Sequence, residues 1–351
     1  MNKTLDIYAG TNARQVIKDN GFNQTLFSSF LGASGGPKWF TLFGLDKYLF
    51  GEFFKHRTDA LSVIGSSAGA FRAACFSQQD PVAAISRLAK YYSETVYSDN
   101  VTPAEISSKA RTLLAEVFGA DGASQVIHNN IFQAHFIVAR TKGLVAFEHK
   151  ALQLSGLLKS YAMNRVSRSL LRSQYERVIY QSPYSHFKLR DESGFVTHHI
   201  SLTPQNIADA LLASGSIPLV MQGIKNIAGS PEGMYRDGGI IDYHFDFKIE
   251  NPKRLTLYPH FNSRPKAGWF DKNLKRAVDP QNYANTVMLV PSDSFVKSLP
   301  FSKIPDREDF KVLDAPQRIK YWKTVLTETE RLAEAFADFV YKQDMSKIRI
   351  L

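Results

Sequence analysis

A serine between two glycines is the clearest candidate for chemistry in this sequence. Gly65-Ser66-Ser67-Ala68-Gly69 has the pattern G-x-S-x-G and follows the apolar run Leu61 to Ile64. A serine on a sharp strand-to-helix turn can point its hydroxyl outward only if the residues two positions away are small. The pattern predicts that Ser67 is a nucleophile at a helix N-terminus, where free N–H groups favour negative charge on a reacting carbonyl.

A glycine-rich segment, Gly32-Ala33-Ser34-Gly35-Gly36-Pro37-Lys38, also lies between an expected strand and an expected helix. Consecutive glycines there allow main-chain N–H groups to face one point, as an oxyanion hole or an anion cradle requires. The spacing fits neither the phosphate loop nor the dinucleotide-binding fingerprint. The segment therefore predicts a site for a negatively charged oxygen, and by itself it is equally compatible with a plain helix start.

An acidic residue in a glycine-rich turn, Asp237-Gly238-Gly239, follows 170 residues after Ser67. An ionised aspartate beside a serine can orient the hydroxyl and accept its proton. Alone, an Asp-Gly pair indicates only a turn. Asp237 is the predicted partner of Ser67 if folding brings the two together.

In this order, the three segments resemble the patatin-like phospholipases, a family that uses a Ser-Asp dyad without histidine. The resemblance covers roughly Leu26 to Tyr243 and includes the segment Ala213 to Pro218. It implies the following roles: Ser67 as nucleophile within Gly65 and Gly69, Asp237 as base before Gly238 and Gly239, the N–H groups of Gly35 and Gly36 as oxyanion hole, and Lys38 at the family's basic position. Ser34 and Trp39 stand where the family usually has glycine, which bears on the shape of the hole.

The resemblance implies a lipid acyl hydrolase of the phospholipase A or lysophospholipase type, which works through an acyl-enzyme without a metal or organic cofactor. One alternative is an α/β-hydrolase with a Ser-His-Asp triad, which would use Asp237 or Asp242 and His244 or His260. Another alternative is a noncatalytic basic protein that binds membrane or nucleic acid. Loss of activity in a His244 or His260 variant would favour the triad.

The elements around these motifs predict an α/β fold, specifically a three-layer α/β/α arrangement with a mainly parallel central sheet, as in patatin-like proteins. We expect strands over Leu26 to Leu31, Leu61 to Ile64, Phe195 to Leu202, Leu255 to Phe261 and Val287 to Val290. A hairpin is expected from His135 to Phe147, and it too is similar to the family. Residues 1–351 are expected as a single catalytic domain, with a core over about 20–250 and a C-terminal extension, 251–351, packed on it.

Helices are expected over Pro37 to Phe50, Ala68 to Phe76, Asp80 to Gly119, Thr203 to Ala213 and Ala315 to Tyr341. Cap signals support three of the starts: Asp80 before Pro81, Thr102 with a capping-box Glu105, and Asp314. Leu152 to Ile179 reads as helical with a break near Asn164. In its second half Arg165, Arg168 and Arg172 align opposite the apolar stripe, which predicts a basic amphipathic helix.

The charge balance favours anionic surfaces as partners. The formal net charge is +10, and residues 150–190 contribute eight basic residues against one acid, Glu176. We therefore expect a lipid or phospholipid substrate and peripheral contact with anionic membrane through Arg165, Arg168 and Arg172. No nucleic acid is expected, because no nucleic-acid-binding motif accompanies the charge. The single cysteine, Cys75, and the lack of an apolar leader predict a cytoplasmic protein without a disulfide.

Overall fold

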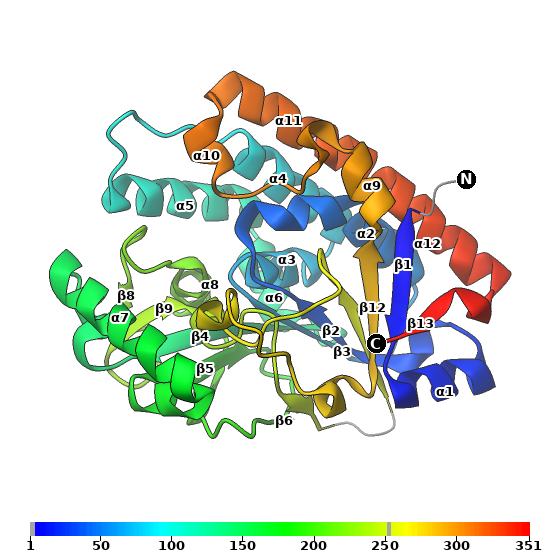
Figure 1. Cartoon of the computed structure of the whole chain (residues 1–351), viewed down its shortest axis with the longest axis horizontal. Helices are drawn as coiled ribbons and strands as arrows, with labels where there is room; N and C mark the ends of the chain where they lie inside the picture. The colour runs from blue at the N-terminus through cyan, green and yellow to red at the C-terminus, as the bar shows by residue number, and fades with distance from the viewer. Residues whose placement is uncertain (1–3, 251–253) are drawn as a thin grey trace.

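The computed structural model describes residues 4–250 and 254–351, which are built around one large mixed sheet (Figure 1). Along this sheet the strands run in the order β13 (Ile348–Ile350), β1 (Leu5–Ala9), β12 (Thr286–Pro291), β11 (Leu255–Pro259), β2 (Phe27–Gly32), β3 (Leu61–Ser66), β4 (Phe132–Thr141), β5 (Tyr175–Gln181) and β7 (Thr197–Ser201). β9 (Met234–Asp237) pairs with β4 and with β8 (Ile224–Lys225), and β6 (Leu189–Arg190) pairs with β10 (Lys248–Ile249) in a separate small sheet.

The centre of the main sheet is parallel: β12, β11, β2, β3 and β4 pair side by side in one direction. β1 pairs with β12 and β5 pairs with β4 in the antiparallel sense. The central strands are short apolar runs that are buried on both faces, as parallel strands covered by helices must be. The predicted α/β class with a mainly parallel central sheet is confirmed.

The helices cover this sheet, with α3, α4 and α11 on one side of it and α7 on the other in Figure 1. Their bounds are α1 (Thr11–Asn20), α2 (Phe43–Tyr48), α3 (Ala68–Phe76), α4 (Pro81–Ser93), α5 (Pro103–Phe118), α6 (Gly122–His128), α7 (Lys150–Val166), α8 (Ile207–Gly215), α9 (Asp293–Ser298), α10 (Asp309–Val312), α11 (Ala315–Glu328) and α12 (Glu330–Lys342). The predicted helix from Pro37 to Phe50 is divided into η2 (Gly36–Leu42), α2 and the start of η3 (Leu49–Phe53).

The predicted helix starts at Asp80, Thr102 and Asp314 are confirmed, because each side chain accepts a hydrogen bond from an N–H group of the first turn. The capping box is wrong: the Glu105 carboxylate accepts instead from the N–H and hydroxyl of Ser98. The single closing helix is also wrong, since α11 and α12 meet at Thr329. The Thr329 hydroxyl accepts from the N–H of Gly44 on α2 and so fixes the break.

The predicted hairpin between His135 and Phe147 is wrong. β4 is one ten-residue strand that pairs with β3, β5 and β9, and Leu144 lies in a 3-10 turn, η4 (Gly143–Ala146). Gly143 has a φ of +62°, which turns the chain out of the sheet and toward α7. The apolar residues after Gly143 therefore begin a helical layer and do not return as a strand.

The predicted basic amphipathic helix after Asn164 is also wrong. α7 ends at Val166, close to the expected break, and is followed by the 3-10 segment η5 (Arg168–Ser173) and then by strand β5. The run Tyr175 to Ile179 is buried in the sheet between β4 and β7. By periodicity alone, a short apolar run is equally compatible with a helix and with a buried strand. Here the run forms a strand because it pairs with β4 and β7.

The C-terminal part of the chain contributes to the central sheet. The sequence predicts that residues 251–351 pack on the core as an extension, whereas β11 pairs with β2 and β12 pairs with β11 inside the sheet. The expected boundary at residue 251 lies outside the described residues. The segments between these strands and α11 can therefore reach the edge of the sheet where β2 and β3 end.

Candidate active site

Ser67 lies on a strained turn between β3 and α3. Its φ of +53° and ψ of −127° fall outside the regions that non-glycine residues ordinarily occupy. A Cβ on Gly65 would lie 2.1 Å from the Gly69 carbonyl oxygen, and one on Gly69 would lie 1.8 Å from that of Gly32. The two glycines of the motif are therefore required for the close approach of α3 to β2 and β3.

The sheet brings Asp237 to Ser67. On β4, the neighbouring residues Ile137 and Val138 pair with Ser66 of β3 and Asp237 of β9 respectively. β9 therefore continues along β4 where β3 ends, so that residues 170 positions apart in sequence become neighbours. The Ser67 hydroxyl donates a hydrogen bond of 2.8 Å to Asp237 Oδ2.

The second carboxylate oxygen of Asp237 is held by the D-G-G turn. Asp237 Oδ1 accepts a hydrogen bond of 2.7 Å from the N–H of Gly239. A Cβ on Gly238 would lie 2.0 Å from the Ile137 carbonyl oxygen, so this position also needs glycine. Burial raises the pKa of Asp237, whereas the charge of Arg307 and the hydrogen bonds from Gly239 and Ser67 lower it.

Gly35 is the N-cap residue of η2, and Gly36 is its first residue. The first N–H groups of a helix have no partner within the helix. Gly36 has a φ of +55° and, like Ser67, lines a shared cavity. The Lys38 ammonium does not stand alone, because it forms a 2.5 Å ion pair with Asp306.

The two residues that replace the family's usual glycines have distinct places. The Ser34 hydroxyl lies 2.7 Å from the Ser66 hydroxyl, and its N–H donates to the Tyr243 carbonyl, so Ser34 ties the glycine-rich segment to the motif turn. Trp39 is buried, packs against Phe40 and Phe43, and forms part of the cavity wall. The indole therefore shapes the cavity from the side.

A cavity of about 820 Å³ opens from Ser67 between α4, α5, α8 and the segment before α11. This volume lies within the range of roughly 300–1,000 Å³ that is usual for ligand pockets. Apolar side chains dominate its wall, among them Phe71, Leu88, Leu113, Leu212, Ile217 and Met221. Such a wall suits an apolar ligand group.

Two residues near the dyad were not predicted from the sequence. Ser214 bridges the turn to the sheet: its hydroxyl accepts from the Ser67 N–H at 2.9 Å and donates to the Ile137 carbonyl. It belongs to the segment Ala213 to Pro218, whose resemblance to the family was the available signal. Arg307 lines the cavity with Gly36 and Ser67, and no motif surrounds it.

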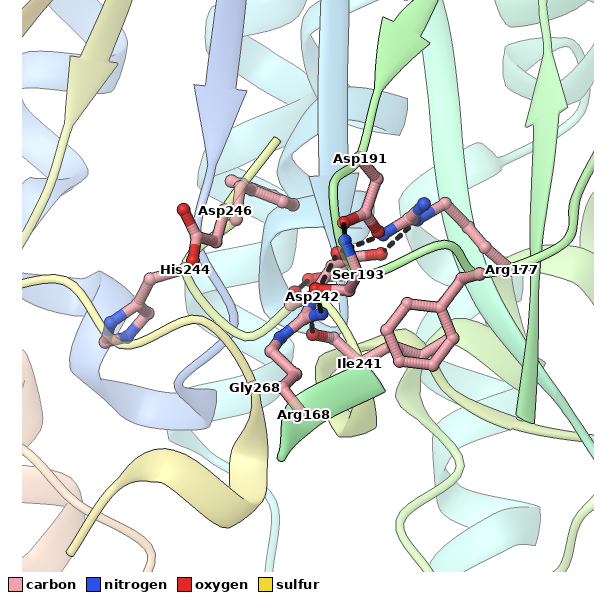
Figure 2. Close-up of polar contacts among 12 residues, drawn as sticks. Arg168, Arg177, Asp191, Ser193, Ile241, Asp242, His244, Asp246 and Gly268 are labelled. Atoms are coloured by element: carbon pink, nitrogen blue, oxygen red, sulfur yellow. Dashed lines mark hydrogen bonds and ion pairs between the residues drawn. The ribbon is translucent and has the colours of Figure 1, made fainter. Parts of the chain in front are cut away.

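A buried ion cluster lies behind the D-G-G turn (Figure 2). Both carboxylate oxygens of Asp242 accept from the guanidinium of Arg177, at 2.6 and 2.9 Å, and Arg177 also binds Asp191. The backbone carbonyl of Asp242 accepts from the hydroxyl of Ser66, next to Ser67. The cluster therefore fixes both the D-G-G turn and the motif turn.

The geometry gives no support to a Ser-His-Asp triad. A triad aspartate accepts from the Nδ1–H of its histidine, but Asp242 is occupied by Arg177. His244 Nδ1 accepts from the backbone N–H of Lys266, and His260 Nδ1 contacts the backbone of Asn262. Burial lowers the pKa of both rings, to about 3 for His260. The Ser67 hydroxyl is already committed to Asp237.

The three arginines predicted to contact membrane do not share a surface. Arg168 is buried and donates to the Ile241 carbonyl and to Ser193, so its predicted membrane contact is wrong. It lies inside the cluster of Figure 2 because β5 replaces the expected helix and draws η5 into the core. Arg165 and Arg172 are exposed.

Within residues 4–250 and 254–351, no three His, Cys, Asp or Glu side chains are grouped so that they could hold a metal ion. No helix in the same ranges is long and apolar enough to cross a membrane.

A comparison with protein-family models agrees with these motifs. A model of the patatin-like phospholipase family matches residues 33–244, which include Ser67 and Asp237 and end before Arg307. Among solved structures, human GIVD cytosolic phospholipase A2 aligns with a TM-score of 0.42 and 11% sequence identity, over 99% of this chain and 67% of the human one. No curated protein matches the sequence.

Proposed function

The chain belongs to the patatin-like phospholipase family, which implies lipid acyl hydrolase activity, and from this premise we propose that it hydrolyses fatty acyl esters of phospholipids or lysophospholipids through Ser67 and Asp237. The observation that carries the proposal is the 2.8 Å hydrogen bond from the Ser67 hydroxyl to the Asp237 carboxylate. It lies at the end of an apolar cavity of about 820 Å³. A hydroxyl that donates to a carboxylate can lose its proton to that carboxylate as it attacks a carbonyl carbon.

The proposed reaction has two halves. Ser67 Oγ forms a bond to the acyl carbon while its proton passes to Asp237, and the N–H groups of Gly35 and Gly36 stabilise the oxyanion. The ester C–O bond then breaks, and the alcohol leaves with the proton from Asp237. Water next gives a proton to Asp237 and attacks the acyl-enzyme, which releases the fatty acid and restores Ser67.

A fluorophosphonate probe tests this proposal directly, because such probes phosphonylate activated serines. We expect the wild-type protein to gain the probe's mass on the peptide that contains Ser67, and the Ser67→Ala protein to gain none. Ser173→Ala is the control, because the Ser173 hydroxyl is exposed and donates to the Leu170 carbonyl of its own 3-10 segment. Labelling of another serine with Ser67 unmodified would overturn the assignment.

We further infer that α7 carries a membrane-binding surface, because its two faces are reversed relative to an ordinary surface helix. Its buried face is largely small or polar, and Ser160 and Asn164 there bond to Tyr175 and Asp271. Its exposed face is apolar and basic. This α7 surface comprises Leu154, Leu158, Tyr161, Lys150, Lys159 and Arg165. Leu158 is 61% exposed.

An anionic phospholipid bilayer fits the α7 surface best. Apolar side chains enter the acyl boundary while flanking lysines and arginines contact anionic headgroups, at about 1 kcal/mol for each basic residue. Gln153 of α7 accepts from the N–H of Leu219, in the loop that supplies Ile217 and Met221 to the cavity wall. The helix is therefore coupled to the cavity through one loop.

Vesicle co-sedimentation tests the α7 surface. We expect Leu158→Asp and Arg165→Glu each to weaken binding to phosphatidylserine-containing vesicles about tenfold, with no loss of activity on a soluble short-chain ester. Tyr341→Asp is the matched control, because Tyr341 is 88% exposed on α12 at the opposite end of the molecule (Figure 1). Unchanged vesicle binding, or a dimer that Leu158→Asp dissociates, would contradict the assignment.

A further inference from the structure

Arg307 presents a guanidinium without a carboxylate partner to the cavity beside the dyad. It belongs to the segment between η9 (Pro300–Ser302) and α10, and it lines the cavity together with Gly36 and Ser67. Its Nε lies 2.7 Å from the position that a Cβ on Gly36 would take, so the side chain packs directly on the glycine-rich loop. Tyr92 is its hydrogen-bond neighbour in the same wall.

Several buried arginines of this protein pair with carboxylates, whereas Arg57 and Arg318 donate to backbone carbonyls instead. Arg72 pairs with Asp46, Arg177 with Asp242, and Arg236 with Glu148. For Arg307, no carboxylate within residues 4–250 and 254–351 comes within ion-pair distance. The carboxylate of the adjacent residue, Asp306, forms an ion pair with the Lys38 ammonium at 2.5 Å.

Arg307 is partly exposed, and it lines a largely apolar wall without a carboxylate partner. An anionic ligand bound there would accept charge-assisted hydrogen bonds from its guanidinium. The five N–H donors of arginine form a planar fork that matches the oxygens of a phosphate or a carboxylate. The cavity is thus equipped for a ligand that carries both an apolar chain and an anionic group.

We propose that Arg307 binds the phosphate group of a glycerophospholipid while Ser67 attacks its acyl ester. The inference rests on the proposed function and names the substrate class for the same site. In a glycerophospholipid the phosphate and the acyl esters are carried on one three-carbon backbone, so their receptors must also be close together. Arg307 meets this requirement because it packs on Gly36, part of the loop proposed to hold the oxyanion.

This role distinguishes phospholipids from neutral glycerides. A diacylglycerol with the same chains can contact the apolar wall in the same way, but it leaves Arg307 without an anionic partner. It therefore lacks the charge-assisted hydrogen bonds that a phosphate would make. Arg307 lies outside residues 33–244, and this specificity therefore comes from the C-terminal part of the chain. Lys38 is less suited to the role because Asp306 already balances its charge.

The test compares two substrates that differ only in the phosphate headgroup. With full-length protein in mixed micelles, we expect Arg307→Gln to lower kcat/KM for dioleoyl phosphatidylglycerol on the order of 100-fold and for dioleoylglycerol less than threefold. Arg307→Lys should fall between, because it keeps the charge but loses the fork. Arg331→Gln is the matched control, because Arg331 is an exposed arginine of α12 that pairs with Glu328 at the end of α11.

Arg307 could also affect activity through the ionisation of Asp237 or through folding, and the comparison of two substrates distinguishes these effects from phosphate binding. Its charge also favours ionised Asp237, so each variant is measured at the plateau of its own pH profile. Equal losses on both substrates would overturn the proposal in favour of a role in the chemical step or in folding, and no loss on either would overturn it outright. Activity that survives Ser67→Ala would instead overturn the proposed function.

A binding arm identifies the source of the phosphate. Calorimetry with the Ser67→Ala protein should detect dihexanoyl phosphatidylglycerol, and Arg307→Gln in the same background should weaken that binding roughly tenfold or more. Inorganic phosphate alone should bind much more weakly than the lipid. Equally tight binding of inorganic phosphate would show that the guanidinium serves a free anion, and would overturn the assignment to a lipid headgroup.

Discussion

Replacing Asp237 with asparagine is expected to lower kcat for ester hydrolysis by about 10³- to 10⁴-fold while the protein stays folded. The asparagine oxygen can still accept from the N–H of Gly239, which keeps the side chain in place. The amide that then faces Ser67 carries no negative charge and cannot take the hydroxyl proton. Steady-state kinetics on a soluble short-chain ester, with the melting temperature measured in parallel, check this expectation.

The histidine variants are the controls for this prediction. His244→Asn and His260→Asn retain an acceptor where each ring presents Nδ1 to the backbone, so both should fold and keep activity within about threefold of wild type. A loss of about 10³-fold in one of them at unchanged melting temperature would restore the Ser-His-Asp triad. Retained activity in Asp237→Asn would rule out Asp237 as the catalytic base of Ser67.

The environment of Asp237 explains how one carboxylate can serve as base in both halves of the cycle. A carboxylate with the ordinary pKa is a weak base near neutral pH, and burial raises the pKa of Asp237 above that value. The charge of Arg307 lowers the pKa of Asp237 and so opposes this effect in part. Because the base must be ionised, wild-type activity should fall as the pH falls through this raised pKa.

The parts of the site that could be predicted are those with a local steric cause. Gly65, Gly69 and Gly238 are each required because a backbone atom passes within about 2 Å of where a Cβ would stand. Such positions leave a pattern in the sequence that is readable without the fold. The strands before the glycine-rich loop and before the motif turn are likewise short apolar runs bounded by glycine.

The parts that could not be predicted depend on contacts between distant segments. Arg168 looks like a member of a basic helix face, yet in the fold it is buried and donates to the Ile241 carbonyl. Arg177 lies on β5, where it is buried and paired with Asp242 and Asp191. Arg307 has no surrounding motif and reaches the dyad only because β11 and β12 place the C-terminal segments at the same end of the sheet as Ser67. Contacts between segments far apart in the chain leave no local pattern in the sequence.

The buried cluster around Arg177 should be the main electrostatic support of the site. Its guanidinium is fully buried and binds Asp242 through two bonds and Asp191 through a third, 2.6 Å long. Although burial raises the pKa of Asp191, the charge of Arg177 holds it below its ordinary value. This contribution to stability is therefore present above the pKa of the unfolded carboxyl, about 3.9, and is lost as the pH falls through the lower folded value.

Arg177→Met is expected to lower the free energy of unfolding by about 3–5 kcal/mol near pH 7, because it removes the guanidinium that binds both buried carboxylates and leaves Asp242 only a longer, 3.6 Å contact with Arg168. Without the arginine, burial should raise the pKa of Asp191, so the loss relative to wild type should shrink as the pH is lowered toward 5. Urea unfolding at several pH values measures both effects. Arg190→Met, which removes an exposed arginine paired with Glu192, should cost less than about 1 kcal/mol at every pH. A loss for Arg177→Met that does not depend on pH would indicate that packing, and not charge, is what the residue supplies to the turn behind Asp237.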